Sequence, residues 1–470
     1  MAVHRTAYER HAPDPRLVAR SLEGSEQAVF WLDDVEAGAR HPELTSPTRA
    51  DLTIVGGGYL GLWSAVHAKR RDPGRRVVLL EAHTVGWAAS GRNGGFCEAS
   101  LTHGEDNGRN RWPEEYDVLA RLGAENLDAF ESDVRELGLD CEWERTGALS
   151  VAVEEHQVGW LRESPGFLDR AGVRAEIDSP LFLAGALHPG QSAMLHPARL
   201  ALELARVAVD LGVGVHEHSA VTGLRRTSSG SVEVHTDRAT VTSDHVVLAT
   251  NVFPALVRRN RLMTVPVYDY VLMTEPLSAE QLSSIGWQGR QGLGDLAQQF
   301  HYARLSADHR ILWGGYDAIY PAGGRMGVRH EDRPESHARL ASHFLATFPQ
   351  LADVRFTHRW AGAIDTSTRF TAFYGLTHGG RVAHAAGFTG LGVGATRFAG
   401  EVVLDLLAGV PTERTELRMV RERPLPFPPE PLASVGINLT RWSLDRADHR
   451  EGRRNAFLRV LDAAGLGFDS

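Results

Sequence analysis

The chain has 470 residues, of which 43% are hydrophobic and 23% are charged, and its formal net charge is −9. This composition predicts a globular protein and excludes a disordered chain and a general binder of nucleic acid. No apolar run is long enough to span a membrane, and the first residues lack the apolar core of a signal peptide. The two cysteines, Cys97 and Cys141, exclude a disulfide framework and favour a cytoplasmic location.

Lys69 is the only lysine, and it lies at the basic end of a predicted helix. That is a poor place for the Schiff-base lysine of a pyridoxal-phosphate enzyme. A Gly-Lys-Ser/Thr sequence is also absent, which excludes a Walker phosphate loop. The histidines show no paired spacing, so we expect no metal site.

Residues 1–47 are predicted to form an N-terminal extension. Phe30, Trp31 and Leu32 are suited to docking it on a larger body. A loosely ordered arm is the alternative, and the sequence leaves both open.

A short strand is then predicted at 51–55, a helix at 62–71 and a second buried strand at 76–80. A parallel βαβ unit is the economical interpretation, because strand, turn, helix and strand follow within about 30 residues.

Further along the chain, apolar periodicity predicts helices and short strands in alternation. The predicted helices lie at 112–140, 155–171, 196–211, 333–347 and 395–408. The predicted strands lie at 147–153, 213–216, 220–224, 231–236 and 245–250, with a strand-rich region at 261–320. The tail, 411–470, is Pro-rich first and then helical.

The strongest motif is Gly56-x-Gly58-x-x-Gly61, between the first strand and its helix. Its glycines permit a tight turn against a pyrophosphate, and the helix N-terminus favours the negative charge. Glu81 ends the second strand, where a carboxylate accepts hydrogen bonds from a ribose. The motif predicts a bound dinucleotide without separating FAD from NAD.

Two further glycine-rich segments favour FAD. One spans 85–96 and follows Glu81 almost directly, where it can run beside a long extended cofactor. The other spans 386–396 and opens a helix, whose N-terminus is suited to stabilise an anionic reduced flavin ring.

The segments DLTIVGGGYLGLWSA, EAHTVGWAASGRNGGF and AAGFTGLGVGATRFAGEVVLDLL resemble the FAD-dependent D-amino-acid oxidase-like superfamily. The SGRNGG form is similar to the branch of γ-glutamylputrescine oxidoreductase and the glycine and sarcosine oxidases. The resemblance covers about residues 25 to 410. It implies an α/β fold: a Rossmann-like FAD/NAD(P)-binding domain built from discontinuous segments, with an inserted α+β substrate domain that has a mixed antiparallel sheet.

This resemblance places the FAD-binding domain at 48–105, 190–258 and 356–410. The substrate domain would comprise 106–189 and 259–355. The extension at 1–47 and the tail at 411–470 would flank both domains.

The cofactor residues carried over from the resemblance lie in six segments of the chain. They are Gly56, Gly58, Tyr59, Leu60 and Gly61; Glu81 and Ala82; Ser90, Arg92, Asn93, Gly94 and Gly95 along the pyrophosphate-to-ring stretch; and Val221 at the adenine, Thr250, Asn251, Gly390, Leu391, Gly392, Val393, Gly394 and Thr396. The family positions for a covalent flavin hold no Cys or His here, so we expect non-covalent FAD.

Aromatic and cationic residues are the candidates for the substrate pocket, because aromatic walls suit an amine and arginine suits an anionic tail. The predicted wall is formed by Tyr302, Arg304, Trp313 and Phe388, with Tyr268, Tyr270, Tyr316, Arg369 and Arg397 as further candidates. Asp269 is suited to attract an ammonium group, although strand alternation can point it away from Tyr268 and Tyr270.

These residues predict an FAD-dependent enzyme that oxidises a C–N bond of an amine or amino acid by hydride transfer to flavin. The imine then hydrolyses to a carbonyl compound and ammonia or an amine, with hydrogen peroxide formed where O2 is the electron acceptor. Lysine is absent near the cofactor motifs, which leaves a dehydrogenase with another acceptor open. The alternatives are an NAD(P)-dependent dehydrogenase and a non-catalytic FAD-binding scaffold; the oligomeric state is not predicted.

Overall fold

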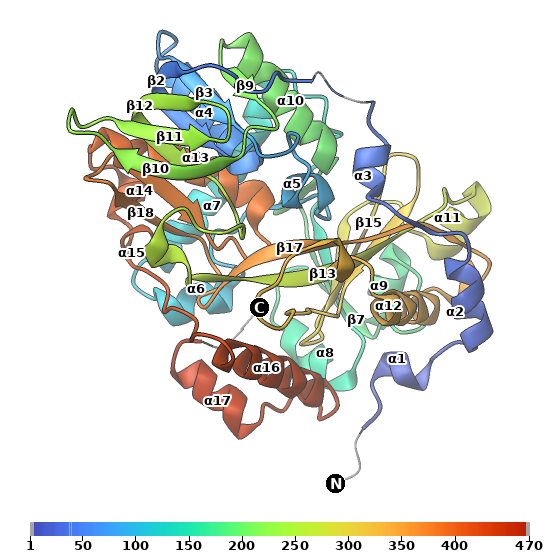
Figure 1. Cartoon of the computed structure of the whole chain (residues 1–470). Coiled ribbons are helices and arrows are strands. Elements are labelled where there is room, and N and C mark those ends of the chain that lie inside the picture. Colours follow the sequence, from blue (N-terminus) through green and yellow to red (C-terminus); the bar gives the residue numbers. More distant parts are fainter. Residues whose placement is uncertain (1–3, 37, 39, 467–470) are drawn as a thin grey trace.

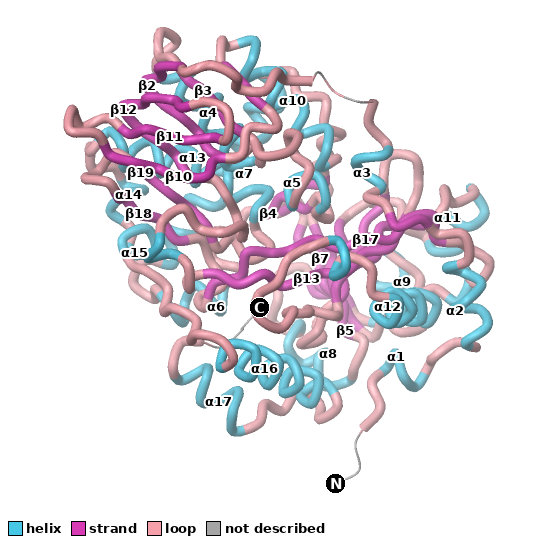
Figure 2. Tube along the Cα trace, viewed as in Figure 1, coloured by secondary structure: helices cyan, strands magenta, loops and turns pink. Residues whose placement is uncertain are grey.

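The strands gather in two large sheets in the computed structural model, which describes residues 4–36, 38 and 40–466 (Figures 1 and 2). The first sheet has a parallel core, in which each strand pairs in parallel with the next. Its order is β19 (Val382–Ala386), β12 (Thr240–Leu248), β2 (Thr48–Val55), β3 (Val77–Leu80) and β9 (Gly214–His216). Two additions widen it: β18 (Phe373–Thr377), antiparallel to β19, and the hairpin β10 (Val221–Arg226) and β11 (Val232–Thr236), which pairs with β12.

Side-chain alternation along these strands divides the apolar residues between two cores. Leu79 packs in the larger core, beneath helices that cover one face of the sheet, whereas Val78 and Leu80 pack in a smaller core on the other face. The covering helices are α4 (Tyr59–Arg71), α7 (Tyr116–Glu136), α10 (Pro197–Asp210) and α13 (Gly392–Ala408). The βαβ unit predicted from the sequence is β2, α4 and β3.

The second sheet has nine strands and is mixed. Its order is β1 (Glu26–Gln27), β17 (Phe356–Ser367), β13 (Thr264–Thr274), β16 (Ile311–Gly315), β15 (His301–Leu305), β14 (Gly292–Asp295), β5 (Ala148–Ala152), β7 (Ala184–His188) and β6 (Phe167–Leu168). Helix α12 (Pro334–Thr347) packs on one face of it. The opposite face includes the residues that meet the first domain.

Shorter elements connect and flank the two sheets. They are α1 (Ala7–Arg10), α2 (Pro15–Leu22), α3 (Phe30–Asp33), α5 (Ala89–Arg92), β4 (Phe96–Glu98), α6 (Glu105–Arg111), α8 (Glu155–Leu161), α9 (Arg170–Glu176), β8 (Ser192–Met194), α11 (Ala279–Ile285), α14 (Glu413–Glu416), α15 (Arg418–Arg421), α16 (Leu432–Asp448) and α17 (Ala456–Ala463), with 3-10 turns at Arg258–Asn260, Val328–His330 and Pro349–Leu351.

Three sequence expectations differ from the structure. Helix α7 lies within the segment 106–189, expected in the substrate domain, but its apolar residues pack with α13 in the larger core of the first sheet. The helix expected at 155–171 ends with α8, because Pro165 and Gly166 interrupt it before β6 and α9. The strand β17 lies within the segment expected in the FAD-binding domain, but it pairs with β13 along its whole length in the nine-stranded sheet.

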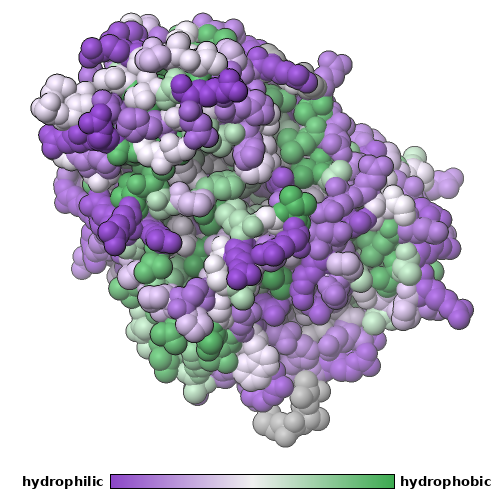
Figure 3. Space-filling view, in the orientation of Figure 1, coloured by the Kyte–Doolittle hydropathy of each residue, from purple (hydrophilic) through white to green (hydrophobic). Residues whose placement is uncertain are grey.

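The N-terminal extension docks on the body of the protein. Its Phe30 and Trp31 are buried, and β1 adds to the edge of the nine-stranded sheet. The C-terminal α16 exposes Leu432, Val435 and Trp442. Figure 3 shows apolar residues gathered at the lower left of the face that it draws. None of the helices within the described ranges is long and apolar enough to cross a membrane.

Candidate functional site

The predicted cofactor residues converge at the carboxyl ends of the parallel strands. Gly56 follows β2, Glu81 follows β3, Thr250 and Asn251 follow β12, and the loop at 387–391 follows β19. This edge of an open parallel sheet is where ligands bind in doubly wound folds. The topology therefore assembles a single site from segments that are more than 300 residues apart in sequence.

The turn after β2 depends on close backbone contact. Gly56 has a φ of +114°. A Cβ atom on Gly61 would lie 1.9 Å from the Gly56 carbonyl oxygen, so the first turn of α4 tolerates only glycine there. The side chains of Tyr59 and Leu60 point into the helix-side core, away from the turn.

Glu81 organises the backbone where the sequence predicts the ribose. Its carboxylate accepts from the N–H of Gly57 at 2.6 Å, from the N–H of His83 at 2.8 Å and from the indole of Trp87 at 3.0 Å. Ala82 beside it is exposed. Ser219, two residues before Val221, donates its N–H to the Glu81 backbone carbonyl at 2.7 Å, which brings the adenine-side strand β10 to this corner.

The second glycine-rich loop closes over the first. Ser90 Oγ accepts from the N–H of Tyr59 at 3.0 Å. Asn93 fastens its own loop, donating to the carbonyls of Ala89 and Ser90 and accepting from the N–H of Gly95. The guanidinium of Arg92 pairs with Glu331 of the other domain, so this side chain bridges the domains and is not free for a pyrophosphate.

The loop before α13 is held by Asp365, a residue that the sequence analysis did not identify. Its carboxylate accepts from the N–H of Gly387 at 2.5 Å, and burial raises its pKa to about 6. The helix begins after Leu391 without a side-chain cap. Thr396 and Val393 turn back into the helix and the core. The N–H of Ala395 makes the first intrahelical bond, to the Leu391 carbonyl at 3.1 Å, so the N–H groups before it, from Gly392 to Gly394, are available to a ligand.

These features fit FAD. Helices α4 and α13 both begin at this edge, and neither N-cap residue, Gly58 or Leu391, provides a side-chain cap. Uncapped N-termini favour an anion such as a pyrophosphate or a reduced flavin. The glycines leave room for close backbone approach, and Glu81 offers an acceptor beside them.

The candidate substrate side of the site contains Tyr302 on β15 and Asp269 on β13, the two strands on either side of β16. The Tyr302 hydroxyl donates to Asp269 at 2.5 Å. A Cβ on Gly94 would lie 2.8 Å from the Tyr302 ring, and Phe96 meets that ring edge-on at 5.7 Å. Asp269 also pairs in register with Gly362, which lies against Arg92. The carboxylate therefore faces the cofactor loop.

Burial governs the protonation of this pair. It raises the pKa of Asp269 to about 6, and the Tyr302 hydrogen bond opposes that rise by stabilising the carboxylate. The pKa of the Tyr302 hydroxyl is raised well above its ordinary value by burial and by the neighbouring carboxylate. At neutral pH the pair is a carboxylate that accepts from a neutral phenol.

Strand alternation takes several expected wall residues away from this surface. Trp313 stacks on His301 and packs against Phe344 of α12, on the far face of the sheet. The same face holds Tyr268, Tyr270 and Tyr316. Phe388 is buried in the core of the cofactor domain. Of the expected aromatic wall, Tyr302 alone is brought to Asp269 and the cofactor loop.

The three candidate arginines are also occupied elsewhere. Arg304 donates to the backbone carbonyls of Leu195 and Gly95, and burial lowers its pKa to about 10. Arg369 donates to the carbonyls of four residues, Thr371, Ala372, Met419 and Glu422. Arg397 pairs with Asp133 and donates to Asn126. A buried guanidinium must have its N–H groups satisfied, and here the protein itself satisfies them.

Comparison with known proteins agrees with this geometry. The family model described as FAD dependent oxidoreductase (DAO) matches residues 51–406. The chain is 31% identical to the gamma-glutamylputrescine oxidoreductase of Escherichia coli over 393 residues, covering 78% of this chain and 85% of that protein. It is 29% identical to the probable oxidoreductase OrdL of Haemophilus influenzae over 399 residues, 81% of this chain and 88% of that one.

Solved structures share the fold at lower identity. The L-proline dehydrogenase of P. horikoshii superposes with a TM-score of 0.64 at 16% identity, covering 78% of this chain and 95% of its own. The glycine oxidase of Geobacillus kaustophilus has a TM-score of 0.63 at 18% identity, covering 78% and 96%. The predicted fold class, a Rossmann-like domain with an inserted mixed-sheet domain, is confirmed.

Substituting Gly61→Ala is expected to abolish FAD retention, because the new Cβ would lie 1.9 Å from the Gly56 carbonyl oxygen. Flavin content of the purified protein, measured by absorbance, checks this. Gly223→Ala is the matched control, since a Cβ there meets nothing within 4 Å. A fully flavinated Gly61→Ala protein would contradict the placement.

Substituting Glu81→Ala is expected to weaken FAD binding by about 10- to 150-fold. The loss of hydrogen bonds to a charged acceptor costs about 1.5–3 kcal/mol. Titration of the apoprotein with FAD measures the change. Glu81→Gln, which keeps one acceptor oxygen, should lose less; affinity unchanged in both variants would remove Glu81 from the ribose.

Proposed function

Because this chain belongs to the family of FAD-dependent oxidoreductases, we propose that it oxidises a C–N bond of an amine or amino acid. When bound, FAD accepts a hydride from the carbon next to the substrate nitrogen. The resulting imine hydrolyses to a carbonyl compound and ammonia or an amine. The match to the family of FAD-dependent oxidoreductases favours FAD over a nicotinamide cofactor. The two relatives described above, from Haemophilus influenzae and Escherichia coli, are both named as oxidoreductases.

The pairing of Asp269 with Tyr302 is the observation that supports an amine substrate. A carboxylate on the face toward the cofactor loop attracts an ammonium group and then takes its proton, which leaves the neutral amine needed for oxidation. The Tyr302 hydroxyl orients that carboxylate. The ring of Tyr302 and that of Phe96 supply an apolar wall beside it.

The electron acceptor is the second part of the proposal. Lys69, the only lysine, donates to the backbone carbonyls of Pro73 and Arg75 at the opposite end of α4, so it does not serve oxygen at the site. We infer that an acceptor other than O2 is used, or that O2 reacts without help from a lysine. Oxygen uptake compared with dye reduction under the same conditions distinguishes the two.

An anaerobic substrate screen tests the function. The panel contains γ-glutamylputrescine, glycine, L-proline and sarcosine, which are named in relatives or structural neighbours, with unrelated alcohols as controls. Bleaching of the flavin absorption by one amine, with the carbonyl product detected, supports the proposal. Bleaching by alcohols and by no amine would contradict it.

Substituting Asp269→Asn is expected to remove the acid limb of the pH profile of kcat/KM, that is, the fall of kcat/KM at low pH. With a pKa of about 6, Asp269 is ionised above that pH, so kcat/KM of the native enzyme should fall as the pH drops through about 6. The variant should lose this limb and about 10- to 150-fold of kcat/KM at neutral pH, while FAD stays bound. A limb that persists in the variant would assign it to another group.

Substituting Tyr302→Phe is expected to move the same limb to higher pH. The lost hydroxyl stabilised the ionised form of Asp269, so the pKa of the carboxyl rises, by about one unit for a hydrogen bond of about 1.4 kcal/mol. The pH dependence of kcat/KM measures the shift. A limb that stays in place would show that the phenol does not act through Asp269.

Acid precipitation is expected to release all the flavin into the supernatant. Cys97 is fully buried beneath the start of α13, and burial raises the pKa of its thiol, which keeps the thiol protonated and unreactive. Yellow colour left in the pellet would instead indicate a covalent flavin. Peptide mapping would then begin at His103, whose ring lies 3.7 Å from a Cβ built on Gly390.

A further inference from the structure

We propose that the N-terminal arm, residues 26–34, helps to form the FAD-binding site. In this proposal Trp31 is a positioning residue that holds the loop at 92–95. The arm lies outside residues 51–406, which match the family model. The inference concerns how FAD is held. It goes beyond the proposed substrate class and does not depend on it.

The central contact is a hydrogen bond from Trp31 to the cofactor loop. Trp31 is 0% exposed, and its indole N–H donates to the backbone carbonyl of Asn93 at 2.9 Å. Leu32, the next residue, lies 2.9 Å from a Cβ built on Gly91. The arm therefore contacts the glycine-rich loop at two neighbouring points, with one directed bond and one close packing contact.

Two further donors hold the same loop from the nine-stranded sheet. The indole of Trp360 donates to the carbonyl of Arg92 at 2.9 Å, and Arg304 donates to that of Gly95 at 3.3 Å. The Arg304 guanidinium also lies over the Trp31 ring, 5.4 Å from its centre. The three donors thus form one layer behind the loop.

The direction of these bonds fixes the direction of the loop amides. In a trans peptide the N–H points opposite to the C=O of the same peptide unit. Since the carbonyls of Arg92 and Asn93 point to the two indoles, the N–H groups of Asn93 and Gly94 point away from them. Trp31 of the arm thus directs the N–H of Gly94, and Trp360 of β17 directs that of Asn93, toward the opposite side of the loop, where acceptor oxygens of a bound cofactor can be recognised.

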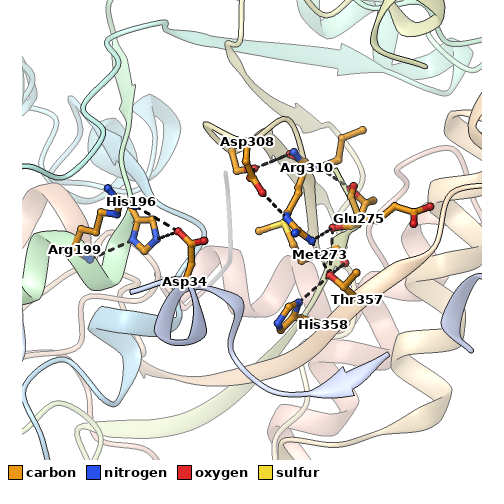
Figure 4. A network of polar contacts seen from close by, with 12 residues as sticks. Asp34, His196, Arg199, Met273, Glu275, Asp308, Arg310, Thr357 and His358 are labelled. Carbon is orange, nitrogen blue, oxygen red and sulfur yellow. Dashed lines mark hydrogen bonds and ion pairs between the residues drawn. The ribbon is translucent and has the colours of Figure 1, made fainter. Parts of the chain in front are cut away.

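The arm is anchored to both domains, and Figure 4 shows the cofactor side of this anchoring, where Asp34 meets His196 and Arg199. On the cofactor side, Asp34 contacts His196 at 3.3 Å and Arg199 at 3.7 Å, both on or next to α10. On the substrate side, Phe30 lies under the Arg310 guanidinium, 5.0 Å from the ring centre, and meets His358 edge-on. A segment fixed at both ends holds the loop in a position set by both domains.

Substituting Trp31→Phe tests the proposal, because it keeps an aromatic ring and removes the N–H donor. The matched control is Trp287→Phe, since Trp287 is 2% exposed, donates its N–H to the Gln291 carbonyl at 3.0 Å and lies in the substrate-domain core. We expect the Kd for FAD to rise about 3- to 10-fold in Trp31→Phe, the range of one neutral hydrogen bond, and to stay at the native value in Trp287→Phe.

Melting temperatures of the apoproteins separate positioning from general destabilisation. Similar losses of melting temperature in Trp31→Phe and Trp287→Phe, with FAD affinity reduced only in Trp31→Phe, support the proposal. Equal FAD affinity in Trp31→Phe and Trp287→Phe would overturn it.

Hydrogen exchange of the native protein provides a test that needs no variant. FAD binding to the native apoprotein should slow amide exchange in peptides covering 26–34. Exchange in 279–285, helix α11 of the substrate domain, should be unchanged. If the arm exchanges at the same rate with and without FAD, it is not coupled to the cofactor and the proposal fails.

Discussion

The junction between the two sheets depends on the backbone of the loop at 92–95. Its carbonyls accept from Trp31, Trp360 and Arg304, which belong to the arm and to the substrate domain. A Cβ on Gly95 would lie 2.2 Å from the Leu195 carbonyl oxygen, so the loop approaches its neighbours too closely for any larger residue. One short segment thus belongs to the cofactor domain in sequence and is held by the substrate domain in space.

Buried charge is the second constraint on the site. Asp269 and Asp365 lie on β13 and β17, strands that pair along their length, and burial raises the pKa of each to about 6. One carboxylate accepts from a phenol at the substrate face, while the other accepts from the backbone N–H of Gly387 before α13. The same pair of strands therefore reaches the proposed substrate face at one point and the loop before α13 at another.

The extensions outside the family-matched residues contribute to the body of the protein. The N-terminal arm fills the angle between α10 and the nine-stranded sheet with Phe30 and Trp31. The C-terminal tail satisfies Arg369 through the carbonyls of Met419 and Glu422. In each case a partner distant in sequence satisfies buried polar groups, since burial without such partners would cost several kcal/mol.

The sequence by itself determined the cofactor half of the protein. The segment from Asp51 to Glu81 contains in succession a strand, a glycine turn, a helix, a second strand and an acidic residue. Each of these local signals predicts the same βαβ unit, so the unit and its ligand were predictable. Helix α13 and its glycine-rich start followed from the same kind of local signal.

Only the tertiary structure decided which side chains of the nine-stranded sheet face the cofactor loop. A one-residue step along a strand reverses the side chain, so Tyr302 meets the cofactor loop while His301 and Trp313 point to α12. Arg304 lies on the expected strand, but carbonyls from residues 95 and 195 occupy its N–H groups. Trp31 was expected only to dock the arm, because nothing local in the sequence specifies a bond to Asn93, 62 residues away.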